Sequence, residues 1–242
     1  MKNPLLVPEL REMLRENDTD ALRDFCESGH PIIIAEMISA LSPDEAWSVL
    51  KTADPKLIAE VFCNLDQDFQ VEIFQKLPRE EVILLVNNMP HDDRADLFKR
   101  LPAEQRESAL RWLAQAERED VRCLIAYPEG TAGSVMTSDY ATLSPDLTVF
   151  QAIERLREVA PNRETIYYAY VVDANRKLLG FVSLKDLIVS RRDAVVQEIM
   201  HRDMIYARTD DDQEDAARKI QKYDLLALPV INEDDKLMGI IT

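Results

Sequence analysis

The chain has 242 residues, a length that suits two domains of ordinary size, each able to bury its own core. Its 29 Lys and Arg residues are outnumbered by 45 Asp and Glu residues, which gives a formal net charge of −16. This surplus of negative charge opposes binding to a phosphate backbone or an anionic lipid surface, so we exclude nucleic acid as a partner.

The cysteines and the apolar runs indicate an intracellular, soluble segment. Cys26, Cys63 and Cys123 are odd in number and widely spaced within apolar patterns, which excludes a disulfide framework and a CxxC metal site. No apolar run approaches the roughly 20 residues that a membrane span needs. The first residues, Met1 to Leu6, contain no basic segment that leads into an apolar stretch. We therefore expect reduced core thiols in a cytosolic protein.

The N-terminal half has the pattern of short, regularly spaced helices. The stretch from Pro8 to Ser28 predicts two helices, and prolines then recur at the start of segments with helical apolar spacing. Proline suits the first turn of a helix, where no backbone N–H is needed, and Ser42 with Glu45 predicts a capping box. Helices this short cannot bury their apolar faces alone, so we expect a stacked superhelix. The recurring prolines are Pro43, Pro55, Pro78, Pro90 and Pro102, spaced by twelve, twenty-three, twelve and twelve residues, with Gln67 at the missing position.

From Tyr127 onward the composition changes. Gly130 and Gly133 lie in a turn-rich stretch that we interpret as a linker. Beyond it, two β-rich runs, Ile166 to Val172 and Leu225 to Ile231, each follow an amphipathic helix and precede a polar turn and a second strand. We therefore expect a helical-repeat domain over residues 1–128, a linker over 129–136, and α/β segments over 137–199 and 200–242.

The two α/β segments are copies of one strand-helix-strand-strand unit. The first copy continues into a helix, Leu184 to Ser190, whereas the second copy stops at Thr242, so we expect the second copy to be incomplete at its C-terminus. The predicted fold class is multidomain α and α/β. The matching residues are Met136, Asp139, Asp146 and Ala152 with Met200, Asp203, Asp210 and Ala216, and Gly180 to Ser183 with Gly239 to Thr242.

The duplicated unit resembles a tandem CBS domain, whose copies carry G-h-x-[ST]-x-x-D at the last strand and helix, here Gly180 to Asp186. The linker Tyr127 to Thr137, together with Thr165 to Asp173 and Asp212 to Glu214, resembles the cytosolic region of MgtE-type magnesium transporters and channels. The helical repeats resemble the N domain of that family. The resemblance implies an N-terminal helical superhelix followed by a CBS pair with a β-α-β-β-α fold.

The resemblance also implies a function. In that family the cytosolic region senses Mg²⁺: filled sites compact a dimeric assembly and close the pore, and emptied sites let it open. It implies homodimerisation through the CBS domains, a transmembrane pore domain in the same full-length chain, and a location on the cytoplasmic face of the cell membrane. Composition and periodicity alone reach only an acidic helical repeat joined to a duplicated α/β module.

Two sets of acidic residues are candidate Mg²⁺ ligands. Asp92 and Asp96 are four residues apart, which places their Cβ atoms about 6 Å from one another on one helical face. Two carboxylates at that distance repel by about 3 kcal/mol at an effective dielectric constant of about 20, and a dication would remove that cost. Alternatively, such acids only favour a helix N-terminus. The resemblance assigns Mg²⁺ to Asp92 and Asp96, and also to Asp212, Glu214 and Asp224.

A nucleotide site is the second candidate, and it too comes from the resemblance. Asp186 is positioned like the CBS carboxylate that binds a ribose, with Ser183 and Lys185 near the phosphates and Tyr168 near the base, so ATP or ADP is a possible cofactor. The alternative is that Asp186 only caps a helix in a vacant cleft. Leu225 stands where some relatives place an aromatic side chain that stacks on the base.

No catalytic set is recognisable, since the sequence contains neither a Walker loop nor a GxGxxG loop nor an HExxH pair. We therefore predict that the chain is not an enzyme. The leading hypothesis is a Mg²⁺-sensing region that gates a magnesium channel or transporter by negative feedback. The alternatives are an adenine-nucleotide energy sensor based on the CBS pair and a protein-docking scaffold based on the helical repeats.

Overall fold

The computed structural model describes residues 7–160 and 165–242 and divides into two compact units. The first unit comprises Met1–Met89 and Asp93–Val121, and helices joined by short turns make up its described part. The second unit comprises Pro90–Asp92 and Arg122–Thr242 and contains two three-stranded sheets. The predicted fold class, multidomain α and α/β, is confirmed.

The helical unit repeats with a strict period of twelve residues. From α1 to α10, each helix begins twelve residues after the one before it, so the predicted pattern of short helices is confirmed and extends to both ends of the unit. The helices are α1 (Val7–Glu16), α2 (Thr19–Ser28), α3 (Pro31–Ile38), α4 (Pro43–Leu50), α5 (Pro55–Cys63), α6 (Gln67–Phe74), α7 (Arg79–Asn88), α8 (His91–Arg100), α9 (Ala103–Trp112) and α10 (Gln115–Ile125).

Capping residues explain where these helices begin. Ser42 and Glu45 form the predicted capping box at α4: the Ser42 hydroxyl accepts from the Glu45 amide at 3.3 Å, and Glu45 Oε2 accepts from the Ser42 amide at 2.9 Å. Pro43 is the first residue of α4, as expected, whereas Pro78 and Pro102 lie one position earlier, at the N-caps of α7 and α9. Both positions tolerate proline, because neither N–H would have a partner within the helix.

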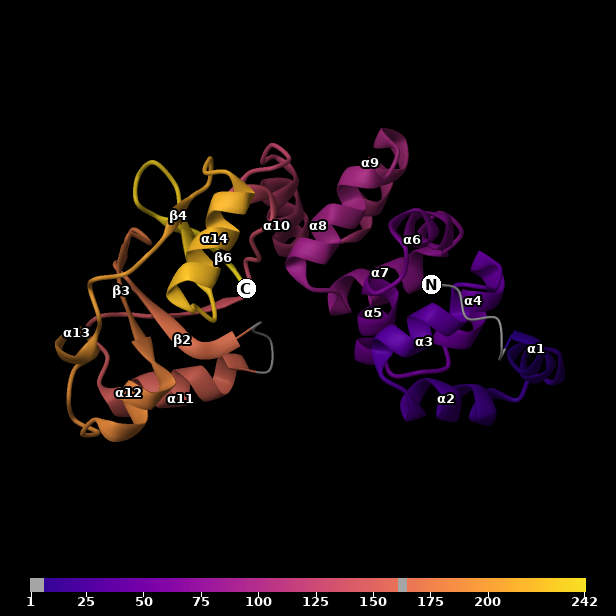
Figure 1. The fold of residues 1–242 in the computed structure, drawn as a ribbon, viewed down its shortest axis with the longest axis horizontal. Helices are drawn as coiled ribbons and strands as arrows, with labels where there is room; N and C mark the ends of the chain where they lie inside the picture. The colour runs from indigo at the N-terminus through magenta and orange to yellow at the C-terminus, as the bar shows by residue number, and fades with distance from the viewer. Residues whose placement is uncertain (1–6, 161–164) are drawn as a thin grey trace. The chain divides into compact units, whose positions relative to one another are not determined.

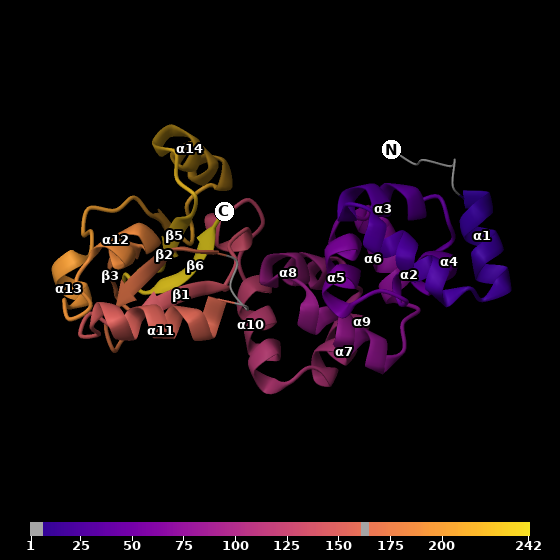
Figure 2. The same ribbon diagram turned by 90° about the horizontal axis from the view of Figure 1, so that it is seen from below.

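The structural repeat is a pair of helices, not a single one. Helices α3, α5, α7 and α9 pack in sequence as one row, and α2, α4 and α6 pack as a second row (Figures 1 and 2). Within these two rows, each helix therefore contacts the next but one along the chain, and the structural period is 24 residues. Buried side chains between the rows include Leu50, Phe62, Leu85 and Phe98. This is the arrangement of a solenoid, in which each unit completes the core of its neighbour.

A polar residue at the same place in successive pairs closes the preceding helix. Gln70, Arg94 and Arg118 are 24 residues apart, and each is the fourth residue of its helix. Gln70 Nε2 donates to the carbonyls of Phe62 and Leu65 at 2.9 and 3.1 Å, beside the end of α5. Arg94 Nη2 donates to Met89 O at 3.0 Å, and Arg118 donates to Leu110 and Leu113 at 2.8 and 2.9 Å. These side chains satisfy carbonyls that a helix end leaves without a partner.

The second unit contains the predicted duplication. In each copy the first two strands pair in parallel and the last two antiparallel, and α11 and α12 pack on the first sheet (Figure 1). The first copy comprises β1 (Tyr140–Leu143), α11 (Val149–Val159), β2 (Thr165–Val172), β3 (Leu178–Ser183) and α12 (Leu184–Val189), and α13 (Val196–Ile199) leads to the second copy, with β4 (Ala207–Arg208), α14 (Gln213–Tyr223), β5 (Leu228–Ile231) and β6 (Leu237–Ile241).

One predicted strand is shorter than expected. The apolar run from Leu225 to Ile231 forms a strand only from Leu228. Asp224 adopts a left-handed conformation with φ of 50°, and the Leu225 amide donates back to Ile220 O at 3.0 Å. Residues 224 and 225 therefore close α14 instead of entering the sheet, because a left-handed residue terminates a helix and leaves its carbonyls capped.

The predicted linker over residues 129–136 is partly built into the second copy. Ala132–Ser134 forms a buried 3₁₀ helix, and the Gly133 amide donates to Thr209 O at 2.9 Å. Only residues 128–130 are exposed throughout. All of residues 129–136 belong to the second unit.

The two copies exchange their entry segments. Thr137 pairs with Ile240 of the second sheet through bonds of 2.8 and 2.9 Å, and the equivalent His201 pairs with Phe181 of the first sheet through bonds of 2.9 and 3.0 Å. The exchange brings backbone against backbone at the glycine of the CBS motif. A Cβ on Gly180 would lie 2.5 Å from His201 O. Neither sheet can therefore be completed without the other copy.

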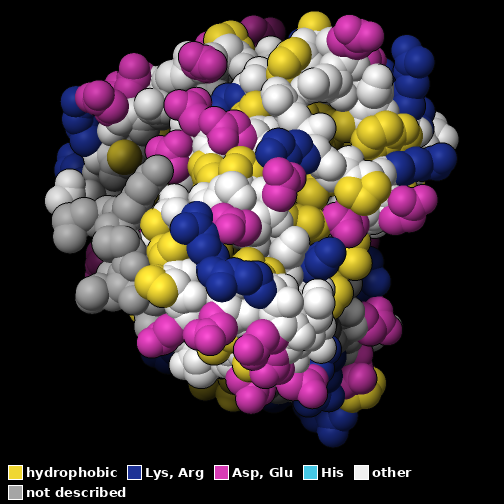
Figure 3. All heavy atoms as spheres, turned by 90° about the vertical axis from the view of Figure 1, so that its right-hand side faces the viewer, with side chains coloured by type: hydrophobic (Ala, Val, Ile, Leu, Met, Phe, Trp, Pro, Cys, Tyr) yellow, Lys and Arg dark blue, Asp and Glu magenta, His cyan; other side chains and the backbone are white. Residues whose placement is uncertain are grey.

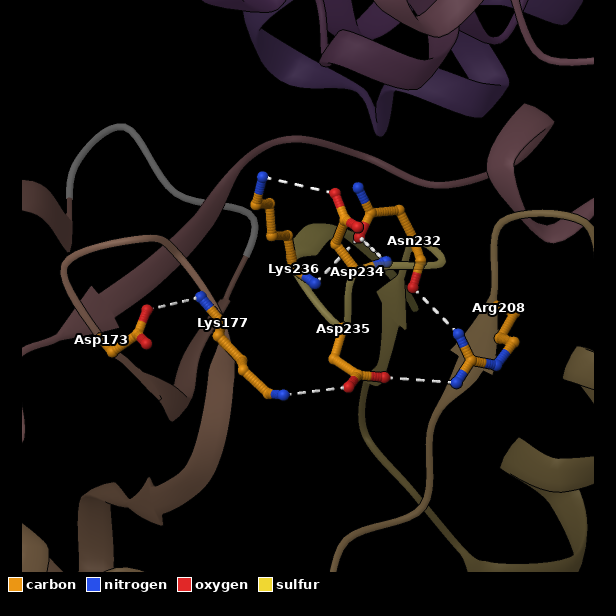
Figure 4. A network of polar contacts seen from close by, with 7 residues as sticks. All are labelled: Asp173, Lys177, Arg208, Asn232, Asp234, Asp235 and Lys236. Atoms are coloured by element: carbon orange, nitrogen blue, oxygen red, sulfur yellow. Dashed lines mark hydrogen bonds and ion pairs between the residues drawn. The ribbon is translucent and has the colours of Figure 1, made fainter.

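A charged network joins the hairpins of the two copies (Figure 4). Asp235 lies 3.1 Å from Lys177 Nζ and 3.2 Å from Arg208 Nη2, and Lys177 and Lys236 form an isolated antiparallel bridge. Hydrogen bonds from Lys177 and Arg208 hold the pKa of Asp235 below its ordinary value. Since Lys177 belongs to the first copy and the other residues to the second, the network ties the copies together.

The exchange generates a first prediction. Gly180→Ala should destabilise the second unit by about 1–3 kcal/mol, because the added methyl group meets a fixed carbonyl oxygen. Trp47 and Trp112, the two tryptophans of the chain, both lie in the helical unit. The urea midpoint of unfolding should therefore fall when it is measured by far-UV circular dichroism, which reports both units. It should stay unchanged when it is measured by tryptophan fluorescence, which reports the helical unit. The matched control is Gly29→Ala, where the nearest atoms belong to the flexible Ile34 side chain at 3.1 Å. Equal losses of stability in Gly180→Ala and Gly29→Ala would contradict the proposed role of the exchange.

The charged network generates a second prediction, about pH. The folded-state pKa of Asp235 lies below its ordinary value of 3.8, so its contribution is complete above that pH and declines as the pH falls through the folded-state pKa. Asp235→Asn should lower the free energy of unfolding at pH 7 and flatten its decline on the acid side. Urea unfolding between pH 7 and pH 3 measures both effects. Glu233→Gln, at an exposed position in the same turn, should change neither.

Candidate functional site

On the face that bears α1 and α4, acidic side chains do not form one continuous patch (Figure 3). Figure 3 shows the face that bears α1 and α4, where Asp and Glu side chains are interspersed with Lys and Arg. Ion pairs such as Arg11–Glu45 at 2.9 Å and Lys76–Asp44 at 2.7 Å account for part of this mixture. Acidic residues that could bind a cation must therefore be identified individually, from the ion pairs and hydrogen bonds that each side chain makes.

Asp92 and Asp96 lie one turn apart on α8, as their spacing predicted. Asp96 Oδ1 lies 3.6 Å from Lys99 Nζ and its Oδ2 lies 3.8 Å from Arg100 Nη2. The Asp96 side chain is 48% exposed, so these ion pairs are screened by water and worth little individually. A hydrated dication can compete with Lys99 and Arg100 for this carboxylate.

The three acidic residues at α14 serve the helix ends. Asp212 is the N-cap and accepts from the Glu214 amide at 2.7 Å, Glu214 pairs with Arg218 at 3.1 Å, and Asp224 is the left-handed C-cap. Asp212 therefore caps the N-terminus of α14, which is the alternative role considered for such acidic residues. The twelve steps from Asp212 to Asp224 span about 18 Å along a helix, so these two carboxylates cannot ligate the same ion within one chain.

Among the described residues, Asp92 and Asp96 lie one turn apart on α8, and no larger set of candidate metal ligands comes together. Within residues 7–160 and 165–242, no group of three or more His, Cys, Asp and Glu side chains is arranged to hold a metal ion. Mg²⁺ commonly keeps several waters and uses one or two carboxylates, so a pair such as Asp92 and Asp96 is compatible with weak binding of Mg²⁺.

Asp186 lies at the start of α12, where the CBS resemblance places the ribose. Its Oδ2 accepts from the Ser183 amide at 3.0 Å and from the Ser183 hydroxyl at 2.5 Å, and it lies 3.0 Å from His201 Nε2. Burial alone would raise the pKa of Asp186, but the bonds from Ser183 and His201 outweigh it and lower the pKa. Asp186 therefore caps α12, as the alternative reading held. All three contacts use Oδ2, so Oδ1 remains able to accept a ribose hydroxyl, and Lys185 is exposed beside it.

A small apolar cavity of about 50 Å³ adjoins this region. Tyr168, the predicted base contact, lines it, as does Leu225. Drug-sized ligands occupy pockets of roughly 300–1,000 Å³, so this cavity receives only the edge of a ring unless its side chains move. Its other lining residues include Tyr170, Phe181, Met204 and Pro229.

Sequence reasoning missed two residues of this region. His201 contacts Asp186 and stacks on Phe181 with ring centroids 5.1 Å apart, and it does so because the entry segments are exchanged. Tyr170 is 2% exposed, and its hydroxyl has no hydrogen-bond partner among the described residues. A buried hydroxyl without a partner costs about 1–3 kcal/mol. No signal in the sequence shows that the Tyr170 hydroxyl lacks a partner.

Comparison with known proteins resolves the family. The model of the MgtE intracellular N domain matches residues 29–130, and the CBS domain model matches residues 132–193 and 196–242. The structure of the cytosolic domain of the Mg²⁺ channel MgtE in complex with ATP superposes with a TM-score of 0.89 at 37% identity, covering 96% of this chain and 95% of that one. The chain belongs to the MgtE family. The soluble part of a magnesium transporter, also a solved structure, gives a TM-score of 0.86 at 30% identity and covers 97% of this chain and 93% of that one.

Curated MgtE relatives are longer than this chain. The magnesium transporter MgtE of Thermus thermophilus is 40% identical over 242 residues, which cover 98% of this chain and 53% of the relative. The MgtE of Enterococcus faecalis is 41% identical over 126 residues, or 52% of this chain and 28% of that protein. The chain thus spans about half the length of the Thermus relative. None of the helices in the described part of the chain is long and apolar enough to cross a membrane.

The MgtE match identifies which part of the family this chain represents. It comprises the N domain and the CBS pair, a regulatory region of a transporter family and not of an enzyme family. The prediction that the chain is not an enzyme is confirmed, as is the resemblance to the cytosolic region of MgtE.

Proposed function

We propose that the chain is the Mg²⁺-sensing region that gates an MgtE-type magnesium channel or transporter by Mg²⁺-dependent compaction. The similarity to the cytosolic domain of a Mg²⁺ channel, which extends over 96% of this chain, carries the proposal. The carboxylate pair on α8, Asp92 and Asp96, and the acids of α14, Asp212, Glu214 and Asp224, are the proposed Mg²⁺ ligands.

Electrostatics supplies the mechanism. The net charge of −16 makes the approach of two acidic domains unfavourable, and a dication shared by carboxylates removes part of that repulsion. Mg²⁺ can shift the equilibrium only by its differential affinity for the two states. A compact state that binds one ion tenfold more tightly gains about 1.4 kcal/mol, so several weak sites together move most of the population.

The proposal extends to assembly and location. We place the domain boundaries at residues 1–128, 129–136, 137–199 and 200–242. The CBS pairs form a homodimer, the pore domain belongs to the same full-length chain, and the region works at the cytoplasmic face of the cell membrane. Mg²⁺ binding thus lowers further Mg²⁺ uptake.

Millimolar Mg²⁺ should reduce the radius of gyration of the protein in small-angle X-ray scattering, and NaCl of equal ionic strength should not. The same data give the mass of the dimer. Protection of the exposed residues 128–130 from limited proteolysis should follow the compaction. If Mg²⁺ does not change the radius of gyration while the protein stays folded and dimeric, the proposed sensing function is wrong. The docking-scaffold hypothesis then becomes the better one.

Charge-neutral variants identify the ligands within the same experiment. Asp92→Asn with Asp96→Asn should raise the Mg²⁺ concentration of half-compaction about tenfold, since each ion loses both of its carboxylates there. Asp224→Asn tests α14 and keeps a residue that tolerates the left-handed conformation. The control is Glu9→Gln with Glu12→Gln on the exposed side of α1, which removes the same charge without touching either set.

A second function, binding of an adenine nucleotide in the CBS cleft, is favoured by a specific observation. Asp186 presents one carboxylate oxygen outside its capping bonds, and an apolar cavity lined by Tyr168 lies nearby. A structurally similar MgtE cytosolic domain is in complex with ATP. Ser183 and Lys185 are the proposed phosphate contacts. This function is compatible with Mg²⁺ sensing and would add an energy signal to it.

Calorimetry with ATP and ADP tests the nucleotide site. Asp186→Ala should abolish binding, because it removes the ribose acceptor, and it also removes a carboxylate that bonds the N-cap amide. Glu198→Ala serves as the matched control: Glu198 makes the equivalent bond to the Val195 amide at α13, at 3.4 Å. If the wild-type protein gives no binding heat at millimolar nucleotide, the nucleotide function falls and the Mg²⁺ function stands.

A further inference from the structure

Two buried tyrosines lie together between the CBS copies, and their hydroxyls differ. The rings of Tyr140 and Tyr170 meet edge to face with centroids 6.4 Å apart. The Tyr140 hydroxyl donates to Leu237 O at 3.1 Å and accepts from Arg176 Nη2 at 2.5 Å. The Tyr170 hydroxyl makes no such bond within residues 7–160 and 165–242, although the residue is 2% exposed. Buried polar groups in native proteins are rarely left in this state without a reason.

Tyr170 lines the cavity beside the proposed nucleotide site, and its hydroxyl oxygen is buried there. The cavity has a volume of about 50 Å³, and its remaining walls are aromatic or aliphatic, among them Tyr168, Phe181 and Leu225. Burial raises the pKa of Tyr170, so the hydroxyl stays protonated and can donate as well as accept. The cavity therefore has mainly apolar walls, and the hydroxyls of Tyr168 and Tyr170 are the polar side-chain groups of its lining residues.

The chemistry of these walls selects the part of a ligand that fits. A phosphate or a metal ion would lose its hydration here without gaining an opposite charge, which is strongly unfavourable. A neutral heteroaromatic ring is different, because its faces are apolar and its edge carries ring nitrogens and amino groups. Such an edge can give the hydroxyl the partner that it lacks.

We propose that the Tyr170 hydroxyl is the polar anchor for the edge of a nucleobase in the CBS cleft. The proposal rests on the proposed nucleotide function and adds a specificity-determining residue to it. Tyr168 and the neighbouring apolar side chains pack against the faces of the ring, and the Tyr170 hydroxyl forms a hydrogen bond with its edge. Met204 and Leu225 are aliphatic side chains without a hydrogen bond to break, and their rearrangement enlarges the cavity for the rest of the base.

The proposal predicts two effects of one conservative variant, one on stability and one on nucleotide affinity. Tyr170→Phe keeps the ring and removes only the hydroxyl. Without nucleotide it should be at least as stable as the wild type, because an unpaired buried group is lost. With nucleotide it should bind ATP about tenfold more weakly, equivalent to about 1.4 kcal/mol, because the edge of the base then lacks its partner.

Tyr140→Phe is the matched control. It removes the hydroxyl of the adjacent tyrosine, whose bonds to Leu237 and Arg176 are satisfied within the protein. It should lower the melting temperature and leave the affinity for ATP unchanged. Inorganic triphosphate, which lacks a base, should bind Tyr170→Phe and the wild type equally.

Calorimetry and thermal unfolding of the whole 242-residue chain decide the matter. If the wild type binds ATP and Tyr170→Phe binds it equally well, the anchor is refuted and the nucleotide function stands. If Tyr170→Phe loses as much stability as Tyr140→Phe without nucleotide, the hydroxyl has a partner in the protein and the proposal is also refuted. If the wild type binds no ATP, the nucleotide function and the anchor fall together.

Discussion

The second unit depends on an exchange between its two copies. Each copy sends its entry segment to the sheet of the other, where the backbone of Thr137 or His201 adds two hydrogen bonds to the last strand. The approach is so close that Gly180 and Gly239 have no room for a Cβ. A single copy would leave a sheet edge unpaired and an apolar face open, which is unfavourable in water. The copies therefore form one cooperative body, and any ligand in the seam contacts both.

The helical unit reaches its stability by a different route. Each helix has two to three turns and contributes one apolar face, and neighbouring helices supply the rest of the core, in two rows of helices that are two positions apart in the chain. Gln70, Arg94 and Arg118 close the ends of the preceding helices with side-chain bonds, at intervals of 24 residues. Contacts in such an array are local in sequence, and the unit is built of similar steps.

The proposed ligand-binding residues already have structural roles. Asp212 and Asp224 cap α14, Asp186 caps α12, and Asp96 is paired with two basic side chains. A ligand that binds these groups competes with bonds that the protein already makes, so its affinity is lower than the number of carboxylates suggests. Weak sites suit a sensor, since a feedback signal must be released when the concentration of the ligand falls.

The sequence by itself determined the periodic features of this protein. The twelve-residue spacing of helix starts, the capping box of Ser42 and Glu45, the duplication and the family are local or repeated signals, and they were predicted correctly. Tertiary structure alone decided which partner each group finds. The pairing of helices into 24-residue steps, the approach of His201 to Asp186 and the unpaired hydroxyl of Tyr170 depend on contacts between residues distant in the chain. A sequence pattern reports the faces of a helix or strand, but long-range packing sets what those faces meet.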